Sequence, residues 1–198
     1  MQTELTVTLL LILQVAAQEF KMIYSPNKTL YGNFKMHEVC KSSTAVRLGI
    51  DNTPSDEVLE RAEQTCIHIL QPVRDEFGSL TANSWFRCEE LERAITRNSF
   101  VKWCQQPEKY NHEGFDPLTD YQEAWELYFS RKSHPMGEAV DFEKAGVDNR
   151  AMFNWCKANL PAFDQLIAEF MKADDSSAGW IHGSFSANNN RQQIIEIK

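Results

Sequence analysis

Two residues with metal-binding side chains stand close together in the segment SHPMGEAVDF, residues 133–142. His134 and Asp141 are seven positions apart, with Gly137 and Ala139 between them. These two small residues would let the backbone turn closely and pass into a strand without a side-chain clash. Imidazole and carboxylate groups are common zinc ligands, and a catalytic zinc takes three protein ligands and keeps one position open. The spacing is compatible with one shared metal ion, and the alternative is a capping Asp141 beside a solvated His134.

A third ligand must come from the other histidines of the chain, which has five in all. His68 falls within an amphipathic helix pattern, where a partly buried helix histidine is the simpler interpretation. His37 and His112 stand in polar surroundings with no second ligand nearby, which favours surface positions. His182 lies in the strand-like segment GWIHGSF between apolar residues, where an unpaired imidazole would need a partner. His182 is therefore the best candidate for the third ligand.

Composition limits the class of protein. The chain has 198 residues, 42% of them hydrophobic and 24% charged, which indicates a globular protein of one domain or one domain with an appendage. The net charge of -8 argues against a nucleic-acid partner, because such proteins normally present a basic face. Five cysteines without a CxxC pair predict reduced thiols in and around the core.

The N-terminal segment, residues 5–17, is an apolar run that ends in small residues. It is similar to the central part of an export signal, although Glu4 precedes it and no Lys or Arg does. An export or tethering signal and a packed N-terminal helix or strand both stay open. Residues 1–33 are expected to form this segment and a lead-in, and the compact domain is expected over 34–198.

The elements around the candidate ligands predict an α+β fold. In the strongest helix pattern, Thr53 is the expected cap, Pro54 the first helical residue and Gly78 the end. The segment 162–171 is ambiguous between helix and strand. Further helices are expected near 36–49, from 89 onward and at 148–160, and strands at 79–86, 138–142 and 179–186. The aromatic-rich stretch 97–132 reads as a helical or mixed insertion.

The pattern HPMGEAVD, followed much later by WIH, resembles the zinc D-alanyl-D-alanine carboxypeptidases and endopeptidases that cut peptidoglycan peptides, including phage endolysins. Their motif is H-x-x-G-x-A-x-D with a late histidine, and NSWFRCEELERAI is similar to their S-G-[FY]-R-S/C-P-x-L-N segment. The likeness extends to FDQLIAEF, GWIHGSFS and NNNRQQII. It covers most of the chain outside the N-terminal part and the insertion 97–132.

The resemblance implies a role for individual residues. His134, Asp141 and His182 would bind Zn2+. Arg87 would bind the substrate carboxylate or steady the developing oxyanion, as a bidentate guanidinium can; the simpler alternative is a surface ion pair with Glu89 or Glu90. The family serine would correspond to Ser133 as a substrate contact.

Three departures from the family pattern matter. The serine stands directly before the first histidine, and Lys132 occupies its usual position. Trp180 stands two residues before the last ligand, where a histidine is often found. Gly179 stands where many members have the catalytic acid, so the general base must come from elsewhere. Glu169 is the first candidate and Asp164 the second, with a helix-surface or capping acid as the alternative for either.

The sequence thus predicts a small central antiparallel sheet that carries a zinc site, flanked by helices, with the insertion as a lid or substrate wall. The expected function is a monomeric zinc peptidase that hydrolyses amide bonds in the peptide part of bacterial peptidoglycan. A phage endolysin or wall-remodelling enzyme, acting on the wall from the host cytoplasm or periplasm, fits this best. Membrane contact is expected only if the N-terminal segment is an uncleaved anchor. The rivals are a non-catalytic module of a phage particle and a zinc hydrolase acting on a free dipeptide.

Overall fold

The computed structural model describes residues 22–106 and 121–198. The apolar segment 5–17 and His112 lie outside these ranges, so the expectations for them stay predictions. Within the described ranges, no helix combines the length and apolar character needed to cross a membrane.

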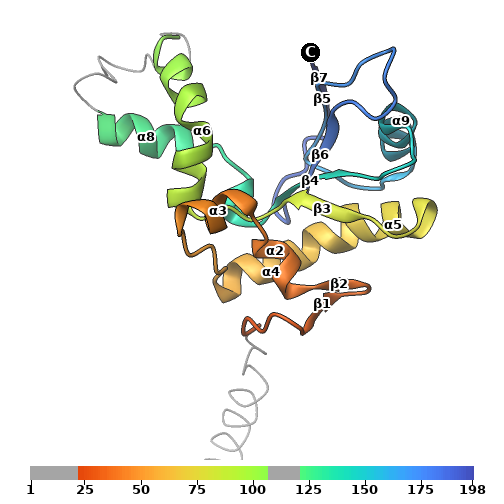
Figure 1. The fold of residues 1–198 in the computed structure, drawn as a ribbon, viewed down its shortest axis with the longest axis horizontal. Coiled ribbons are helices and arrows are strands. Elements are labelled where there is room, and N and C mark those ends of the chain that lie inside the picture. The colour runs from red at the N-terminus through yellow and green to blue at the C-terminus, as the bar shows by residue number, and fades with distance from the viewer. Residues whose placement is uncertain (1–21, 107–120) are drawn as a thin grey trace, which may run out of the picture.

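The centre of the fold is a five-stranded sheet with the strand order β3-β4-β6-β5-β7 (Figure 1). Its strands are β3 (Thr81–Ser84), β4 (Ala139–Glu143), β5 (Gln165–Glu169), β6 (Trp180–Ser184) and β7 (Gln193–Ile197). The ambiguous segment is therefore a strand, and the α+β prediction is confirmed.

The expectation of an antiparallel sheet holds for all pairings except the last, because β7 runs parallel to β5. The physical reason is that β6 runs antiparallel to β5 and ends beside the start of β5, and the chain then turns back, so that β7 runs opposite to β6. The connection after β6 carries the chain back to the start of β5, where the amide of Gln193 donates to the carbonyl oxygen of Asp164. The strand then continues alongside β5 in the same direction.

Helices and a small hairpin surround this sheet. The hairpin pairs β1 (Thr29–Tyr31) with β2 (Phe34–Lys35). The helical elements are α2 (Met36–Cys40), α3 (Ser43–Leu48), α4 (Asp56–Thr65), η1 (Cys66–Leu70), α5 (Gln71–Phe77), α6 (Glu89–Cys104), α8 (Tyr121–Phe129), η2 (His134–Met136) and α9 (Asn149–Asn159).

The long helix predicted near residues 51–78 is present as the continuous run α4-η1-α5, but it begins later than expected. The cap is Ser55, whose hydroxyl accepts the amide hydrogen of Val58, so the assignment of Thr53 as cap and Pro54 as first helical residue was wrong. Gly78 ends the run, as predicted. The middle is a π-helical turn, which gives Pro72 room, because proline lacks an amide hydrogen and crowds the preceding turn of an α-helix.

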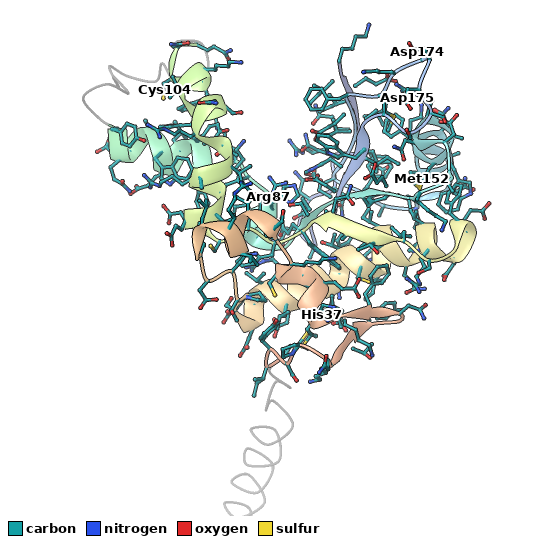
Figure 2. All side chains as sticks on the ribbon, in the orientation of Figure 1. His37, Arg87, Cys104, Met152, Asp174 and Asp175 are labelled. Atoms are coloured by element: carbon teal, nitrogen blue, oxygen red, sulfur yellow. The ribbon has the colours of Figure 1, made fainter. Side chains whose placement is uncertain are left out.

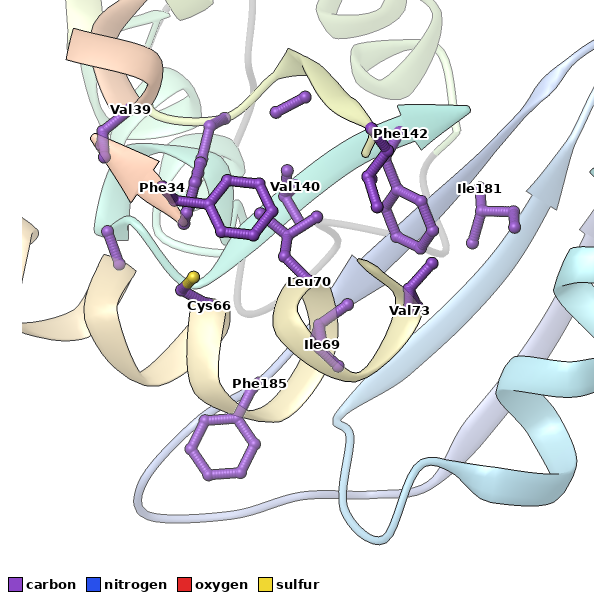
Figure 3. Close-up of a cluster of buried hydrophobic side chains, with 14 of the residues drawn as sticks. Phe34, Val39, Cys66, Ile69, Leu70, Val73, Val140, Phe142, Ile181 and Phe185 are labelled. Atoms are coloured by element: carbon purple, nitrogen blue, oxygen red, sulfur yellow. The ribbon is translucent and has the colours of Figure 1, made fainter. Parts of the chain in front are cut away.

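The main hydrophobic core lies between one face of the sheet and the helices α4, η1, α5 and α9. Figure 3 shows Phe142 and Ile181 of the sheet near Ile69 and Val73 of the helix, and all four side chains are fully buried. A Cβ added at Gly183 of β6 would lie 2.8 Å from a methyl group of Ile69, so helix and sheet approach closely here. Because side chains alternate along a strand, the neighbouring positions of β4 and β6 project to the opposite face, which carries the candidate site.

A second, smaller core joins α6 and α8, which lie together to one side of the sheet (Figure 1). We call this pair of helices the arm. Phe100, Trp103, Trp125 and Tyr128 form its buried centre. The indole of Trp125 donates to the carboxylate of Glu89 at 2.8 Å, which ties α8 to the first turn of α6. The described part of the insertion 97–132 is thus helical, and its first helix starts before the insertion.

The cysteines agree with the prediction of reduced thiols. All five are free. Cys66 and Cys156 are fully buried in the main core, and burial raises the pKa of Cys156 to about 12. These two thiols therefore behave as small apolar core residues.

Candidate metal centre

Two neighbouring strands and a short helix bring His134, Asp141 and His182 together. Asp141 on β4 is the direct cross-strand partner of His182 on β6, so both side chains project to the same face of the sheet. His134 opens η2, just before β4. The candidate ligand atoms of the three residues lie within 4.8 Å of one another, and each residue is less than a tenth exposed. The structure therefore contains a buried group that could hold a metal ion.

Gly137 explains how the chain turns between His134 and the strand. Its φ of 77° lies in the left-handed region, where residues with a side chain are strained. In addition, a Cβ at this position would lie 2.6 Å from the carbonyl oxygen of Val58 on α4. The turn can pack against α4 only because residue 137 has no side chain.

The ring of His134 is fixed in one tautomer by a main-chain contact. Its Nδ1 lies 2.6 Å from the carbonyl oxygen of Trp85. A carbonyl oxygen can only accept, so Nδ1 carries the hydrogen and Nε2 keeps its lone pair. Nε2 lies 3.3 Å from Oδ1 of Asp141. His134 thus presents a lone pair to the site in a set orientation.

The carboxylate of Asp141 is shared between the histidines and an arginine. Its Oδ1 is 2.9 Å from Nδ1 of His182, and its Oδ2 is 2.6 Å from the guanidinium of Arg87. Around a tetrahedral ion with ligands at about 2.0–2.1 Å, neighbouring ligand atoms are about 3.3 Å apart. The separations of Oδ1 from the two imidazole nitrogens, 3.3 and 2.9 Å, are close to that value, and all three ligand atoms lie within 4.8 Å of one another, so the group could hold a metal ion.

The surroundings favour the protonation states that a metal ligand needs. Burial lowers the pKa of His134, which keeps its imidazole neutral. Burial alone would raise the pKa of Asp141, but its interactions with the two neighbouring histidines outweigh burial and lower this pKa well below its usual range. A neutral imidazole and an ionised carboxylate are the forms that coordinate metals.

Arg87 lies beside this group, where the base of the arm meets the sheet (Figure 2). All three nitrogen groups of its guanidinium are engaged. Nε donates to the hydroxyl of Ser84 at 2.8 Å, one amino group donates to Asp141, and the other lies 3.5 Å from Oε2 of Glu92. The side chain of Arg87 is 14% exposed and that of Glu92 only 2%, so this is a buried ion pair.

The contact with Glu92 was not expected from the sequence. The simple alternative for Arg87 was an ion pair with Glu89 or Glu90, but Glu89 pairs with Arg93 instead. Glu92 was overlooked as one more acid in a charged helix start. Its place beside Leu91 on the buried side of α6 could have indicated an internal partner, because acids are rarely buried unless paired.

Glu169, the first candidate for the general base, projects to the same face as the metal group. It ends β5 and pairs across the strands with Trp180, two residues before His182 on β6. Burial raises the pKa of Glu169, and the negative charge of Asp141 raises it further. The carboxylate is therefore near enough to the site to respond to its charges.

Gly179 has a structural reason to lack a side chain. Its φ is 73°, and a Cβ there would collide with the carbonyl oxygen of Glu169. A carboxylate therefore cannot be placed at residue 179 without moving the end of β5. In this fold the acid beside the site comes from the neighbouring strand.

Asp164 and Ser133 have other partners. Asp164 receives two hydrogen bonds from the guanidinium of Arg191, at 2.7 and 2.6 Å, which lower its pKa and tie the connection before β7 to β5. The carbonyl oxygen of Ser133 accepts the amide hydrogens of Met136 and Glu138, which shapes the turn after His134. Asp164 and Ser133 thus hold the backbone around the site in place.

The two other described histidines do not join the group. His37 lies near the β1-β2 hairpin, and its Nδ1 contacts the carbonyl oxygen of Pro26 (Figure 2). His68 lies on η1, on the core side of the sheet, with its ring stacked on Phe185 at 3.8 Å. These positions agree with the interpretations made from the sequence.

In comparisons with known proteins, no protein-family model, no curated protein and no solved structure is significantly similar to this chain.

Proposed function

We propose that this protein is a zinc-dependent peptidase that hydrolyses amide bonds in the peptide part of bacterial peptidoglycan, as an endolysin or a wall-remodelling enzyme. The observation that carries the proposal is the buried His134–Asp141–His182 group with ionisable Glu169 on the same face of the sheet. Two imidazoles and one carboxylate suit zinc and leave one coordination position open. The resemblance of HPMGEAVD and WIH to the peptidase motif supports the choice of substrate.

Zinc bound there would polarise a scissile carbonyl group and acidify a water molecule. Glu169 takes the proton of the attacking water and delivers it to the leaving amine, as a general base that becomes a general acid. Its raised pKa strengthens it as a base compared with an ordinary glutamate. Asp164 is the weaker candidate, since the hydrogen bonds from Arg191 lower its pKa and occupy its carboxylate.

Arg87 binds the substrate through those guanidinium N–H groups that make no contact within the protein. A guanidinium has five N–H groups, and the contacts with Ser84, Asp141 and Glu92 use three of them. The others can bind a substrate carboxylate or a developing oxyanion, at a separation set by the fixed planar fork. Ser133 is the proposed polar contact at the other end of the site.

The arm would supply a second binding surface for the larger part of the wall polymer. A cavity of about 540 Å³ lies between its helices, lined in part by Arg93, Phe100, Tyr121 and Trp125. Aromatic faces with charged groups beside them suit a polar polymer that carries apolar methyl groups.

The test is mass spectrometry of fragments released from purified peptidoglycan by zinc-loaded protein and by chelator-treated protein. New peptide fragments that require zinc support the proposal and identify the bond that is cut. Cleavage of free D-alanyl-D-alanine without release of wall fragments would show a dipeptide hydrolase instead.

A binding module is the second candidate, and the absence of a side chain at Gly179 favours it, since the family's usual acid cannot be placed there. The variant Glu169→Gln separates the two functions. An enzyme loses turnover in this variant but still binds wall fragments. Folded, zinc-loaded wild-type protein that binds walls of several chemical types without releasing fragments would be a binding module.

A further inference from the structure

The connection between β3 and α6, residues 85–88, contacts two of the three candidate ligands. The carbonyl oxygen of Trp85 accepts the hydrogen of His134 Nδ1, and Arg87 donates to Oδ2 of Asp141. The indole of Trp85 also donates to the carbonyl oxygen of Gly137, which joins this connection to the turn after His134. Contacts of this kind set the tautomer and orientation of metal ligands.

We propose that Arg87 is a positioning residue for the metal site, and that buried Glu92 offsets its positive charge so that it can lie beside a bound cation. The inference uses the metal site of the proposed function but not the reaction. It adds to the role of Arg87 toward substrate, because it acts before any substrate binds.

The geometry supports positioning because one oxygen of Asp141 is left for the metal. Arg87 takes Oδ2 at 2.6 Å, while Oδ1 faces both histidines. The carboxylate cannot rotate without breaking the contact with Arg87. Ser84 holds Nε of the same guanidinium from the end of β3, where it pairs with Asp141 in the sheet register. Arg87 is thus fixed at two points of one sheet.

The charges explain the presence of Glu92. A guanidinium near a divalent cation repels it, and the repulsion is strong where water is excluded. The side chains of Arg87, Glu92 and Asp141 are 14%, 2% and 10% exposed, so solvent screens them little. The charge of Glu92 cancels that of Arg87, and Asp141 keeps its full negative charge for the metal. Glu92 and Arg87 together have no net charge, and through the contact of Arg87 they orient the carboxylate of Asp141.

Lysine could not replace Arg87 in this role. The three acceptors lie in different directions around the planar fork, on β3, β4 and α6. An ammonium group is a compact point charge and would reach only some of them. The substitution Arg87→Lys therefore keeps the charge and removes the orientation, which makes it the informative variant.

The experiment measures the affinity for Zn2+ alone, without substrate, by competition with a chromogenic chelator. We expect R87K to bind zinc about 10–100-fold more weakly than wild type, and E92Q about 10-fold more weakly. S84A, a mild change that leaves the ion pairs in place, should weaken binding about 3-fold. The visible spectrum of the Co2+-loaded protein should change in R87K, because the ligand geometry changes.

The matched control is R191K. Arg191 holds Asp164 as Arg87 holds Asp141, through a short guanidinium–carboxylate contact, but Asp164 is not a candidate ligand. We expect R191K to bind zinc within about 2-fold of wild type, because Arg191 contacts Asp164 and the lysine keeps its positive charge there. Far-UV circular dichroism of each variant shows whether it is folded.

A folded R87K or S84A protein with wild-type zinc affinity and Co2+ spectrum overturns the positioning role. An E92Q protein with unchanged affinity overturns the charge compensation. Wild-type protein that binds no zinc overturns this inference together with the proposed function, whereas tight zinc binding without wall cleavage leaves the inference intact and contradicts the peptidase alone.

Discussion

The substitution Asp141→Asn tests the metal centre most directly, because it removes one charge and keeps the shape. Two consequences follow from the contacts of Asp141. Without metal, Arg87 loses an ionised partner at 2.6 Å. Breaking a buried pair costs about 3–5 kcal/mol, and the amide oxygen of asparagine can still accept one hydrogen bond, so we expect a loss of about 2 kcal/mol. For a domain of this size, that lowers Tm by about 4–8 °C.

The second consequence concerns zinc. At a free zinc concentration of about 100 times Kd, wild-type protein should gain about 2.7 kcal/mol of stability. The D141N protein lacks the anionic ligand that faces both histidines, so zinc should not raise its Tm at the same concentration. The assay is thermal unfolding by circular dichroism, with chelator and with zinc, for both proteins.

The control is Asp164→Asn, which also removes a carboxylate paired with an arginine, here just before the starts of β5 and β7. D164N should unfold at a lower temperature than wild type in chelator but keep the full zinc-dependent rise. The reasoning is refuted if D141N keeps that rise, since Asp141 would then not be a ligand.

Three further predictions concern residues around the site. Glu169→Gln should lower kcat/KM by about 10²–10⁴ while zinc affinity changes little. In wild type, activity should fall as pH drops through the pKa of Glu169, which burial raises above its ordinary value. A variant whose activity falls over the same acidic pH range would exclude Glu169 as the base. The Asp164–Arg191 pair should stabilise the fold fully above the unfolded pKa of Asp164, about 3.9, and this stabilisation should disappear as pH falls through the lowered pKa of the folded state. The free energy of unfolding in urea should therefore be smaller for Arg191→Met than for wild type at pH 7, and the difference should shrink near pH 2. Gly179→Ala should lower the free energy of unfolding in urea by at least about 2 kcal/mol, because a positive φ alone costs about 1–2 kcal/mol and the new Cβ collides with the carbonyl oxygen of Glu169. An equally stable variant would show that the backbone at the end of β5 can move without cost.

The sequence could indicate the candidate ligands because they lie either close together in one short segment or in a segment with the apolar pattern of a buried strand. His134, Gly137 and Asp141 lie within one turn and one strand, so their spacing was compatible with one shared ion, although a capping Asp141 beside a solvated His134 stayed open. His182 could be chosen because its apolar neighbours predicted a buried strand position, and the register places it opposite Asp141. The family resemblance supplied the same three residues.

The parts that were missed depend on contacts between distant segments. The pair of Arg87 and Asp141 joins positions 54 residues apart, and Glu92 could be recognised as its third member only once α6 was placed. The parallel pairing of β7 follows from the end of β5 at which β6 stops and from which the chain turns back, and the residues of β7 do not encode that. Ser55 was passed over as a helix cap because Thr53 and Pro54 form an equally good start when read alone.

The buried position of Glu92 also decides where the arm can bend. Glu92 lies in the first turn of α6, so a rotation of the helix about that turn would pull its carboxylate away from Arg87, where solvent screens the two charges little. Bending farther along α6 leaves this pair intact. We therefore expect the arm to be stiffer at its base, next to the candidate metal group, than toward its tip, so that movement of the tip leaves the positions of the three candidate ligands unchanged.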